Sequence, residues 1–384
     1  MHPNDPPHPF ETLTPDVVQD ALNRVGLWGD GRLTALSSYE NRVYLAHLDE
    51  PVDGHRAVVL KFYRPGRWRR ADIEEEHAFA AELAQADVPM VAPLVLQGQT
   101  LHEQSGFWFS VSPNKGGRRP ELDDPDVLEW TGRFLARLHA VGERRAFAHR
   151  PALDLHTFGR EPQDWLLTHQ AVPLDVSAQW ARTLEATLAL LAEVAPELLP
   201  APPVPPDPHE GSTKTRADNA HQMCASAVFD PYFQATNAAR DTAPALQRLR
   251  LHGDCHPGNI LWTPTDRPGG GPHFVDLDDA RSGPAVQDLW MLLTGSNRAE
   301  QTAQLGALLD GYESFRPFDR RELRLIEPLR TLRQIHYCAW LARRWDDPTF
   351  PIHFPWFGSS TYWTGQIHQL EEQLDALHAP PLVA

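Results

Sequence analysis

The first third of the chain alternates short apolar runs with turn-forming residues. Residues 42–46 and 57–62 are predicted β-strands, because β-branched and aromatic side chains fill short runs bounded by turn signals. Two further strands are predicted over 91–96 and 107–111. A helix carrying three consecutive glutamates is expected between the two pairs, over about 72–86. The pattern therefore predicts a small antiparallel sheet with one helix packed against it.

Beyond residue 113 the spacing of apolar residues becomes helical. Asp124-Pro125-Asp126 is a typical helix start, and the apolar residues after it recur every three or four positions. We therefore place an N-lobe at 1–112 and a mostly helical C-lobe at 113–384, which together predict an α+β, bilobal fold. Further helical patterns cover 178–196, 285–295, 299–314, 319–345 and 360–377.

Residues 200–245 interrupt the helical pattern. The run from Ala201 to Pro208 contains five prolines, and proline removes a backbone donor and blocks both helices and inner strands. We interpret the segment as a surface insertion without regular structure, most simply a linker. A Pro-rich docking segment is the alternative.

The strongest chemical pattern is the run LHGDCHPGNILW, residues 251–262. Asp254 is followed five residues later by Asn259, on a loop rich in Gly and Pro that leads into an apolar strand. A second apolar strand, Phe274-Val275, ends in Asp276. Because neighbouring strands bring their ends together, we expect Asp254, Asn259 and Asp276 to meet at one end of the pair.

These three side chains suit phosphoryl transfer. One carboxylate would accept or orient the proton of the attacking hydroxyl, and a carboxylate and an amide would hold Mg²⁺ against the phosphates of ATP, since that ion prefers oxygen ligands. The competing interpretation is a polar loop whose Asp and Asn side chains only cap turns. The flanking His-Gly and the second acidic strand end favour the kinase interpretation.

Lys61 ends the apolar run 58–60 and resembles the strand lysine that contacts ATP phosphates in kinases. The acidic helix that follows offers Glu75 or Glu76 as the ion-pair partner that fixes its ammonium group. We prefer Glu76, because its neighbours on the helix form the inward face. Lys61 and Glu76 are therefore predicted parts of the nucleotide site.

Two further polar positions are candidates for supporting roles. Ser38 lies in the segment 37–42 between predicted strands, where a loop covering the phosphates is expected, and an ordinary hairpin turn is the alternative. Asp288 stands at the start of a predicted helix, and we expect it to brace the catalytic loop, with helix capping as the alternative. The aromatic residues of 337–363 are candidates for a substrate cleft, but core packing is the better interpretation for most.

Composition and charge limit the classes of partner. The chain of 384 residues contains 51 acidic and 35 Lys or Arg residues, which gives a formal net charge of −16. Because nucleic-acid binding needs positive surface, we expect no nucleic-acid partner, although a local basic patch stays compatible with the composition. An acidic protein still binds ATP, since Mg²⁺ and a few basic side chains supply the local positive field.

We expect a cytoplasmic, monomeric protein without a membrane partner. The start of the chain, MHPNDPPHPF, lacks the basic and apolar regions of a secretory signal. No apolar run reaches the roughly 18 residues of a membrane helix. Cys224, Cys255 and Cys338 match no zinc or haem spacing, so free thiols in a reducing compartment are the simplest interpretation.

Outside 200–245, nearly the whole chain resembles the bacterial stress response kinases, Ser/Thr protein kinases of the aminoglycoside phosphotransferase-like superfamily. The resemblance implies a bilobal, protein kinase-like fold of the aminoglycoside phosphotransferase type. It also implies Asp254 as catalytic base, Asn259 and Asp276 as magnesium ligands and Lys61 as a contact of the ATP phosphates. It also implies Ser38 near the nucleotide. The matching segments are SSYENRVY, VVLKFYRPGRW, EEEHAFAAEL, GFWFSVSPNKGGR, LHGDCHPGNILW, FVDLDDARSGPAVQDLWMLL, IEPLR, AWLARRWDDPTFP and FPWF.

The resemblance leaves open whether Asp278 assists the metal. The chain differs from classical protein kinases in one respect, since the acidic segment 276–279 passes almost directly into the helix expected from Ala285. We therefore expect no phosphorylated activation loop of the usual kind.

The function implied is an ATP-dependent Ser/Thr protein kinase with a role in stress response, autophosphorylation included. The alternative is a small-molecule kinase acting on an amino alcohol, an amino acid or an aminoglycoside, because fold does not determine substrate. An acidic cleft beside Asp254 would favour a cationic small substrate, and a wide groove would favour a polypeptide. A catalytically dead scaffold disagrees with the presence of base, metal ligands and lysine together.

Overall fold

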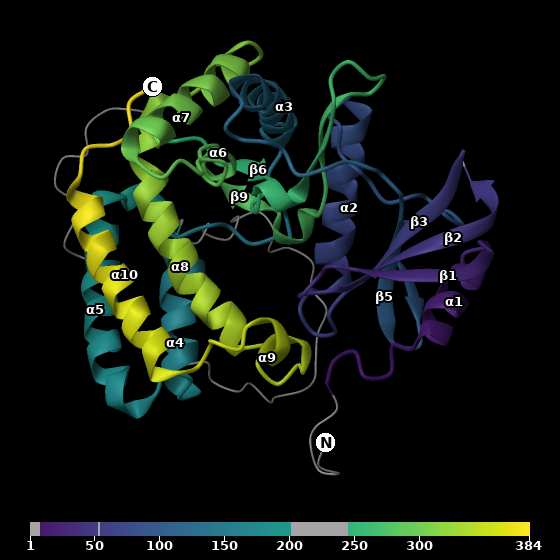
Figure 1. Ribbon diagram of the computed structural model, residues 1–384. Coiled ribbons are helices and arrows are strands. Elements are labelled where there is room, and N and C mark those ends of the chain that lie inside the picture. Colours follow the sequence, from purple (N-terminus) through teal and green to yellow (C-terminus); the bar gives the residue numbers. More distant parts are fainter. Residues whose placement is uncertain (1–7, 53, 201–244) are drawn as a thin grey trace, which may run out of the picture. The chain divides into compact units, whose positions relative to one another are not determined.

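An antiparallel sheet forms the N-terminal part of the computed structural model, which describes residues 8–52, 54–200 and 245–384 (Figure 1). Within these residues the sheet has five strands in the order β1-β2-β3-β5-β4. Lys61 lies on the central strand, opposite Val43 of one neighbour and Ser110 of the other. The strands are β1 (Gly29–Leu36), β2 (Arg42–Val52), β3 (His55–Phe62), β4 (His102–Gln104) and β5 (Phe107–Pro113).

Two helices cover the sheet. Alternation along β3 buries Leu60 and Phe62 in a core with helix α1 (Pro15–Arg24), whose first turn is capped by the Thr14 side chain. Lys61 points to the opposite face, towards helix α2 (Arg70–Gln85). The helix expected over 72–86 is therefore confirmed, and it lies between the sheet and the C-lobe (Figure 1).

The strand predicted over 91–96 is wrong. Val91 N–H donates to the carbonyl of Phe274, and Leu94 N–H donates to that of Val111, so the segment changes partner within three residues. Pro93 lies between them and has no N–H for a continuous ladder. Strand β4 occupies the sheet edge in its place.

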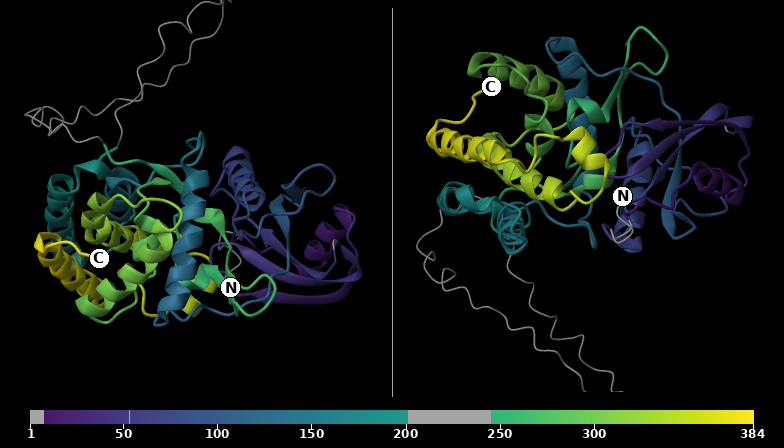
Figure 2. Two further views of the ribbon diagram at one scale, coloured as in Figure 1. Left: turned by 90° about the horizontal axis from the view of Figure 1, so that it is seen from above. Right: turned by 60° about the horizontal axis from the view of Figure 1, so that its bottom comes forward.

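The C-lobe is mostly helical, and helices α5 and α10 lie side by side in it (Figures 1 and 2). Their contact includes an edge-to-face pair of Trp180 and Trp363, with ring centroids 5.4 Å apart. The helices are α3 (Pro125–Gly142), α4 (Glu161–Thr168), α5 (Leu174–Val194), α6 (Gln287–Trp290), α7 (Arg298–Glu313), α8 (Ile326–Ala342), α9 (Thr349–His353) and α10 (Ser360–His378), with a π-helical turn at His156–Arg160.

Two of the predicted helical patterns are shorter in the structure. The pattern over 285–295 yields only α6, because residues 285–293 are buried on every side and their apolar run carries no helical periodicity. The pattern over 319–345 divides into a 3₁₀ turn at Arg320–Leu325 and helix α8. Pro328 explains the break, since proline is tolerated in the first turn of a helix but not in its interior.

The predicted fold class is confirmed: an antiparallel sheet with helices is followed by a mostly helical region. The lobe boundary at 112/113 stays a prediction. The insertion predicted at 200–245 and Cys224 lie outside the described residues, apart from the two end residues of the insertion. Cys255 and Cys338 are free and buried. Among the helices of the described ranges, none has the length and apolar character needed to cross a bilayer.

Helices α3 and α7 approach so closely that glycine is required at their contact. A Cβ atom on Gly132 would lie 2.0 Å from the carbonyl oxygen of Leu308. We expect Gly132→Ala to lower the free energy of unfolding by about 1–3 kcal/mol, because overpacking outweighs the better helix propensity of alanine. Gly306→Ala is the control on α7, since a Cβ there meets nothing within 4 Å. Urea denaturation measures both stabilities. A Gly132→Ala variant as stable as the parent would contradict this close packing.

Candidate active site

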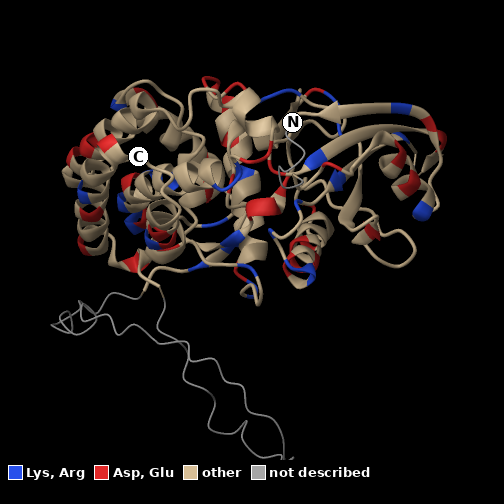
Figure 3. Cartoon of the chain, turned by 90° about the horizontal axis from the view of Figure 1, so that it is seen from below, with Lys and Arg blue, Asp and Glu red and all other residues tan. Residues whose placement is uncertain are grey.

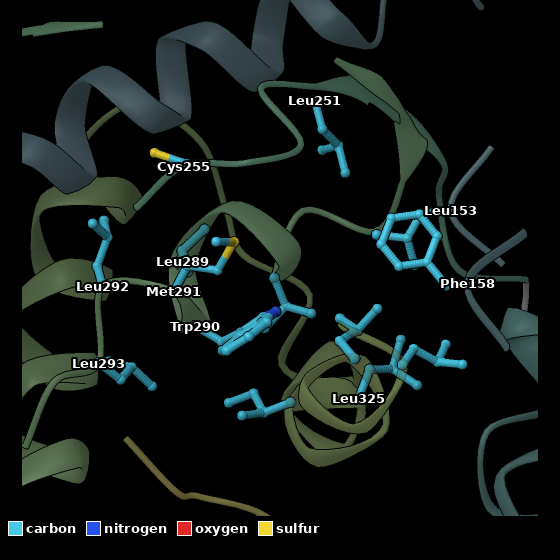
Figure 4. Packing of buried hydrophobic residues seen from close by; sticks show 14 of the residues in the cluster. Leu153, Phe158, Leu251, Cys255, Leu289, Trp290, Met291, Leu292, Leu293 and Leu325 are labelled. Carbon is cyan, nitrogen blue, oxygen red and sulfur yellow. The ribbon is translucent and has the colours of Figure 1, made fainter. Parts of the chain in front are cut away.

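Two short antiparallel strand pairs build the framework of the candidate site. Strands β6 (Leu249–Leu251) and β9 (Arg281–Gly283) pair with each other, as do β7 (Ile260–Thr263) and β8 (Gly271–Phe274). Leu251 and Cys255 belong to the buried core cluster that also contains Leu289 and Met291, so the start of the loop is anchored in the core (Figure 4).

Hydrogen bonds hold the loop residues next to one another. Val275 N–H donates to the carbonyl of Asn259 over 3.1 Å, and the Asn259 side-chain amide donates to the carbonyl of Asp254 over 3.0 Å. Asp276 directly follows Val275 in the chain. The structure therefore brings together the loop positions of Asp254, Asn259 and Asp276, as the sequence predicted.

Asp254 lies between two basic side chains. Its Oδ1 atom is 2.7 Å from Nη1 of Arg333, and its Oδ2 atom is 3.4 Å from Nε2 of His256. Gly258 N–H donates to Nδ1 of that histidine, so the neutral ring carries its proton on Nε2, facing the carboxylate. Burial alone would raise the pKa of Asp254, but Arg333 and then His256 outweigh it, and the pKa lies well below its usual value.

Asp276 and Asp278 present their carboxylates to Lys61. The Nζ atom of Lys61 is 2.8 Å from Oδ1 of Asp276 and 3.3 Å from Oδ1 of Asp278. Asp276 has a left-handed backbone with φ of 63°, a costly conformation for a residue other than glycine and one often found at functional sites. Its side chain is 46% exposed whereas that of Asp278 is 4% exposed, so Asp276 is the more accessible oxygen donor.

The structure decides between the two glutamates that the sequence offered as partners of Lys61. Oε1 of Glu76 is 3.5 Å from Nζ of Lys61. Glu75 faces away and accepts the backbone N–H groups of residues 148–150. Burial alone would lower the pKa of Lys61, but three neighbouring carboxylates outweigh it, and the pKa lies well above its usual value.

Ser38 lies in the loop between β1 and β2, with its side chain partly exposed. No contact found among the described residues ties it to Lys61. Glu40 in the same loop is held firmly, since its carboxylate is 3.0 Å from Arg64, 3.3 Å from Arg67 and 2.6 Å from Arg344 at the end of α8. Acidic and basic segments accordingly gather where the sheet meets the C-lobe (Figure 3).

Asp288 braces the catalytic loop, and that prediction is confirmed. Its two carboxylate oxygens accept the backbone N–H groups of His252 and Gly253, each over 2.8 Å. His139 of α3 lies 3.0 Å from the same side chain, and Tyr312 of α7 contacts the other nitrogen of that ring. Asp288 is fully buried, so the loop start is tied to two helices.

Sequence reasoning missed the arginines of the site. Arg67 contacts Asp278 and Asp279 as well as Glu40, and Arg150 lies 3.5 Å from Glu76. Arg67 follows the conspicuous Pro65-Gly66 pair, which was a usable local signal. Arg333 has no such signal, because nothing around it in the sequence distinguishes it from Arg330, the other arginine of α8.

The aromatic residues of 337–363 divide between core and surface. Trp363 is fully buried, as core packing predicts. Tyr337 and Trp356 are exposed by 38% and 46%. Trp340 is partly buried and donates its indole N–H to Glu40 over 2.7 Å.

Residues 32–326 match the phosphotransferase enzyme family known as APH, and the chain belongs to that family. It is thus a phosphotransferase, which agrees with the arrangement of acid, amide and lysine side chains around the catalytic loop.

Two curated relatives align with almost the whole chain. Stress response kinase A of Escherichia coli K12 is 42% identical over 373 residues, which cover 97% of this chain and 96% of the relative. The serine/threonine protein kinase RdoA of Salmonella typhimurium is 42% identical over 379 residues, which cover 99% and 98%.

Solved structures share the fold at lower identity. A microcompartment-associated aminopropanol kinase has a TM-score of 0.63 and 18% identity, covering 94% of this chain and 98% of its own. An amicoumacin kinase in complex with AMP-PNP and Ca²⁺ has a TM-score of 0.62 and 16% identity, covering 95% and 94%. These similarities concern the fold alone.

Proposed function

We propose that the protein transfers the γ-phosphate of Mg·ATP to Ser or Thr hydroxyls of protein substrates. The observation that carries this proposal is the joining of Asp254, Asn259 and Asp276 at the ends of two short strand pairs, with the Lys61–Glu76 pair facing Asp276. The names of the close relatives support protein as the acceptor. A role in stress response, autophosphorylation, a cytoplasmic location and a monomeric state belong to the same proposal.

Asp254 acts as the base of this reaction. Its carboxylate is held ionised by the Arg333 guanidinium, whose Nη1 lies 2.7 Å from Oδ1. An ionised carboxylate can accept the proton of the acceptor hydroxyl. The acceptor oxygen forms a bond to the γ-phosphorus, the bond from that phosphorus to the β–γ bridging oxygen breaks, and ADP leaves.

The donor set of the site fits Mg²⁺. Asn259 and Asp276 offer an amide and an accessible carboxylate, the oxygen ligands that this hard cation prefers, and Asp278 lies beside them. Within the described residues no cluster of three or more His, Cys, Asp or Glu side chains is placed to hold a metal by itself, so phosphate oxygens would complete the coordination. When bound, the ion neutralises charge on the phosphates.

Lys61 positions the phosphates. In this structure its ammonium contacts Asp276, and Glu76 on α2 forms a second ion pair with it. Because Glu76 is itself held near Arg150, it would keep the ammonium in place if Asp276 held Mg²⁺. Ser38 lies in the loop that would cover the nucleotide from the side of the sheet.

The test is transfer of radiolabelled γ-phosphate from ATP, with Mg²⁺ and then with EDTA. Casein, a basic protein, aminoglycosides and amino alcohols are offered as acceptors, and Asp254→Asn serves as the control. We expect label on protein that depends on Mg²⁺ and is lost in the variant. Label on a small molecule alone would overturn the protein-kinase proposal in favour of the small-molecule alternative and keep the same catalytic residues.

A further inference from the structure

The side chain of Arg333 stands beside the point of reaction. Nη1 of Arg333 is 2.7 Å from Oδ1 of Asp254, and a hydroxyl that gives its proton to that carboxylate must lie within hydrogen-bonding distance of it. Any acceptor therefore approaches within a few ångströms of the guanidinium, whose side chain is 34% exposed. This consequence rests on the proposed function, in which Asp254 is the base.

Most donors of Arg333 are available to an acceptor. A guanidinium has five N–H groups, and within the described part of the chain Asp254 is the one carboxylate that forms an ion pair with it. The remaining donors suit carbonyl or carboxylate oxygens, because a guanidinium accepts no hydrogen bond and repels cations. On the other side of Asp254, Nε2 of His256 lies 3.4 Å from Oδ2, and this side chain adds no negative charge.

The face of α8 that carries Arg333 continues towards the β1–β2 loop. Tyr337 is one turn further on, and its ring stacks on Trp340 with centroids 5.5 Å apart. Trp340 in turn binds Glu40 of that loop. Seven residues of helix span about 10 Å, which matches roughly three residues of an extended peptide.

We propose that Arg333 is a specificity-determining residue that selects acceptors with neutral or acidic groups beside the phosphorylated hydroxyl and disfavours cationic ones. The expected substrate is a polypeptide in which an acidic residue flanks the Ser or Thr. Aminoglycosides and amino alcohols, which carry ammonium groups close to their hydroxyls, meet like charge at this position. An acceptor thus meets a guanidinium at this position although the whole protein is acidic.

The test compares two heptapeptides with one central Ser, flanked either by Glu or by Lys. We expect the parent to favour the Glu peptide in kcat/KM by roughly tenfold or more, the size of one hydrogen bond to a charged group. Arg333→Lys keeps the sign of the preference, Arg333→Gln brings the ratio near one, and Arg333→Glu inverts it. The ratio of two peptides on one preparation is independent of the folded fraction, so a purely structural role does not move it.

Arg330→Gln is the matched control. Arg330 lies on the same helix but pairs with Glu327 and packs over Trp290, so its loss leaves the ratio unchanged. The inference would be overturned if the enzyme phosphorylates peptides but Arg333→Glu changes the ratio of kcat/KM between the Glu and Lys peptides no more than Arg330→Gln does. The proposed protein-kinase function would then still stand. Transfer to aminoglycosides alone, with no peptide labelled, would overturn both.

Discussion

Asp254→Asn is expected to lower kcat for phosphoryl transfer by about 10²- to 10⁴-fold, the usual contribution of a general base. The substitution keeps the shape of the side chain but removes the charge that Arg333 faces and the oxygen that would accept the proton. ATP binding should change little, because the proposed nucleotide contacts, Lys61 with its partners Glu76 and Asp276, lie on other elements. Steady-state kinetics with a peptide acceptor measures kcat, and titration calorimetry measures ATP affinity.

Asp276→Asn distinguishes the binding of Mg·ATP from the acceptance of the proton. It removes the accessible carboxylate next to Lys61 and should weaken the binding of Mg·ATP, whereas Asp254→Asn should leave that affinity intact. Guanidinium denaturation of both variants checks that neither has lost the fold. Near-parental kcat in Asp254→Asn would show that another group takes the proton.

Local spacing accounts for the parts of the site that the sequence predicted. Asp254 and Asn259 lie five residues apart on one loop, and the β7–β8 hairpin that carries Asn259 to Asp276 is also local. Strand alternation on β3 and helical periodicity on α2 place Lys61 and Glu76 on facing sides. Each inference needed only the geometry of one element or of two neighbouring ones.

Long-range ion pairs account for what the sequence left out. Arg42 binds Asp347 across 305 residues, and Arg64 binds the same carboxylate across 283. No periodicity relates positions so distant, because the path of the whole chain between them decides whether they meet. The pairing of Arg333 with Asp254, from which the acceptor preference is inferred, is of the same kind.

Burial explains the errors in secondary structure. Residues 285–293 are enclosed and mostly apolar, so their composition is the same for a helix and for an irregular buried segment. The segment 91–96 has strand-like residues, yet its backbone donors go to β8 and β5 in turn rather than to one neighbour. Tertiary contacts therefore decided both segments, and those contacts lie outside the information in a short window.

Asp288→Ala is expected to lower the free energy of unfolding by about 3–5 kcal/mol, because it strands two buried backbone N–H groups and the imidazole of His139. The same loss frees the loop start at His252 and Gly253, so phosphotransfer should fall even in the fraction that stays folded. Urea denaturation measures the stability, and Asp310→Ala on the exposed side of α7 is the acidic control. Asp288→Asn retains one acceptor oxygen, so its loss of stability should lie between those of Asp288→Ala and Asp310→Ala. A stability loss below about 1 kcal/mol in Asp288→Ala would mean that water satisfies those donors and that the brace contributes little to the fold.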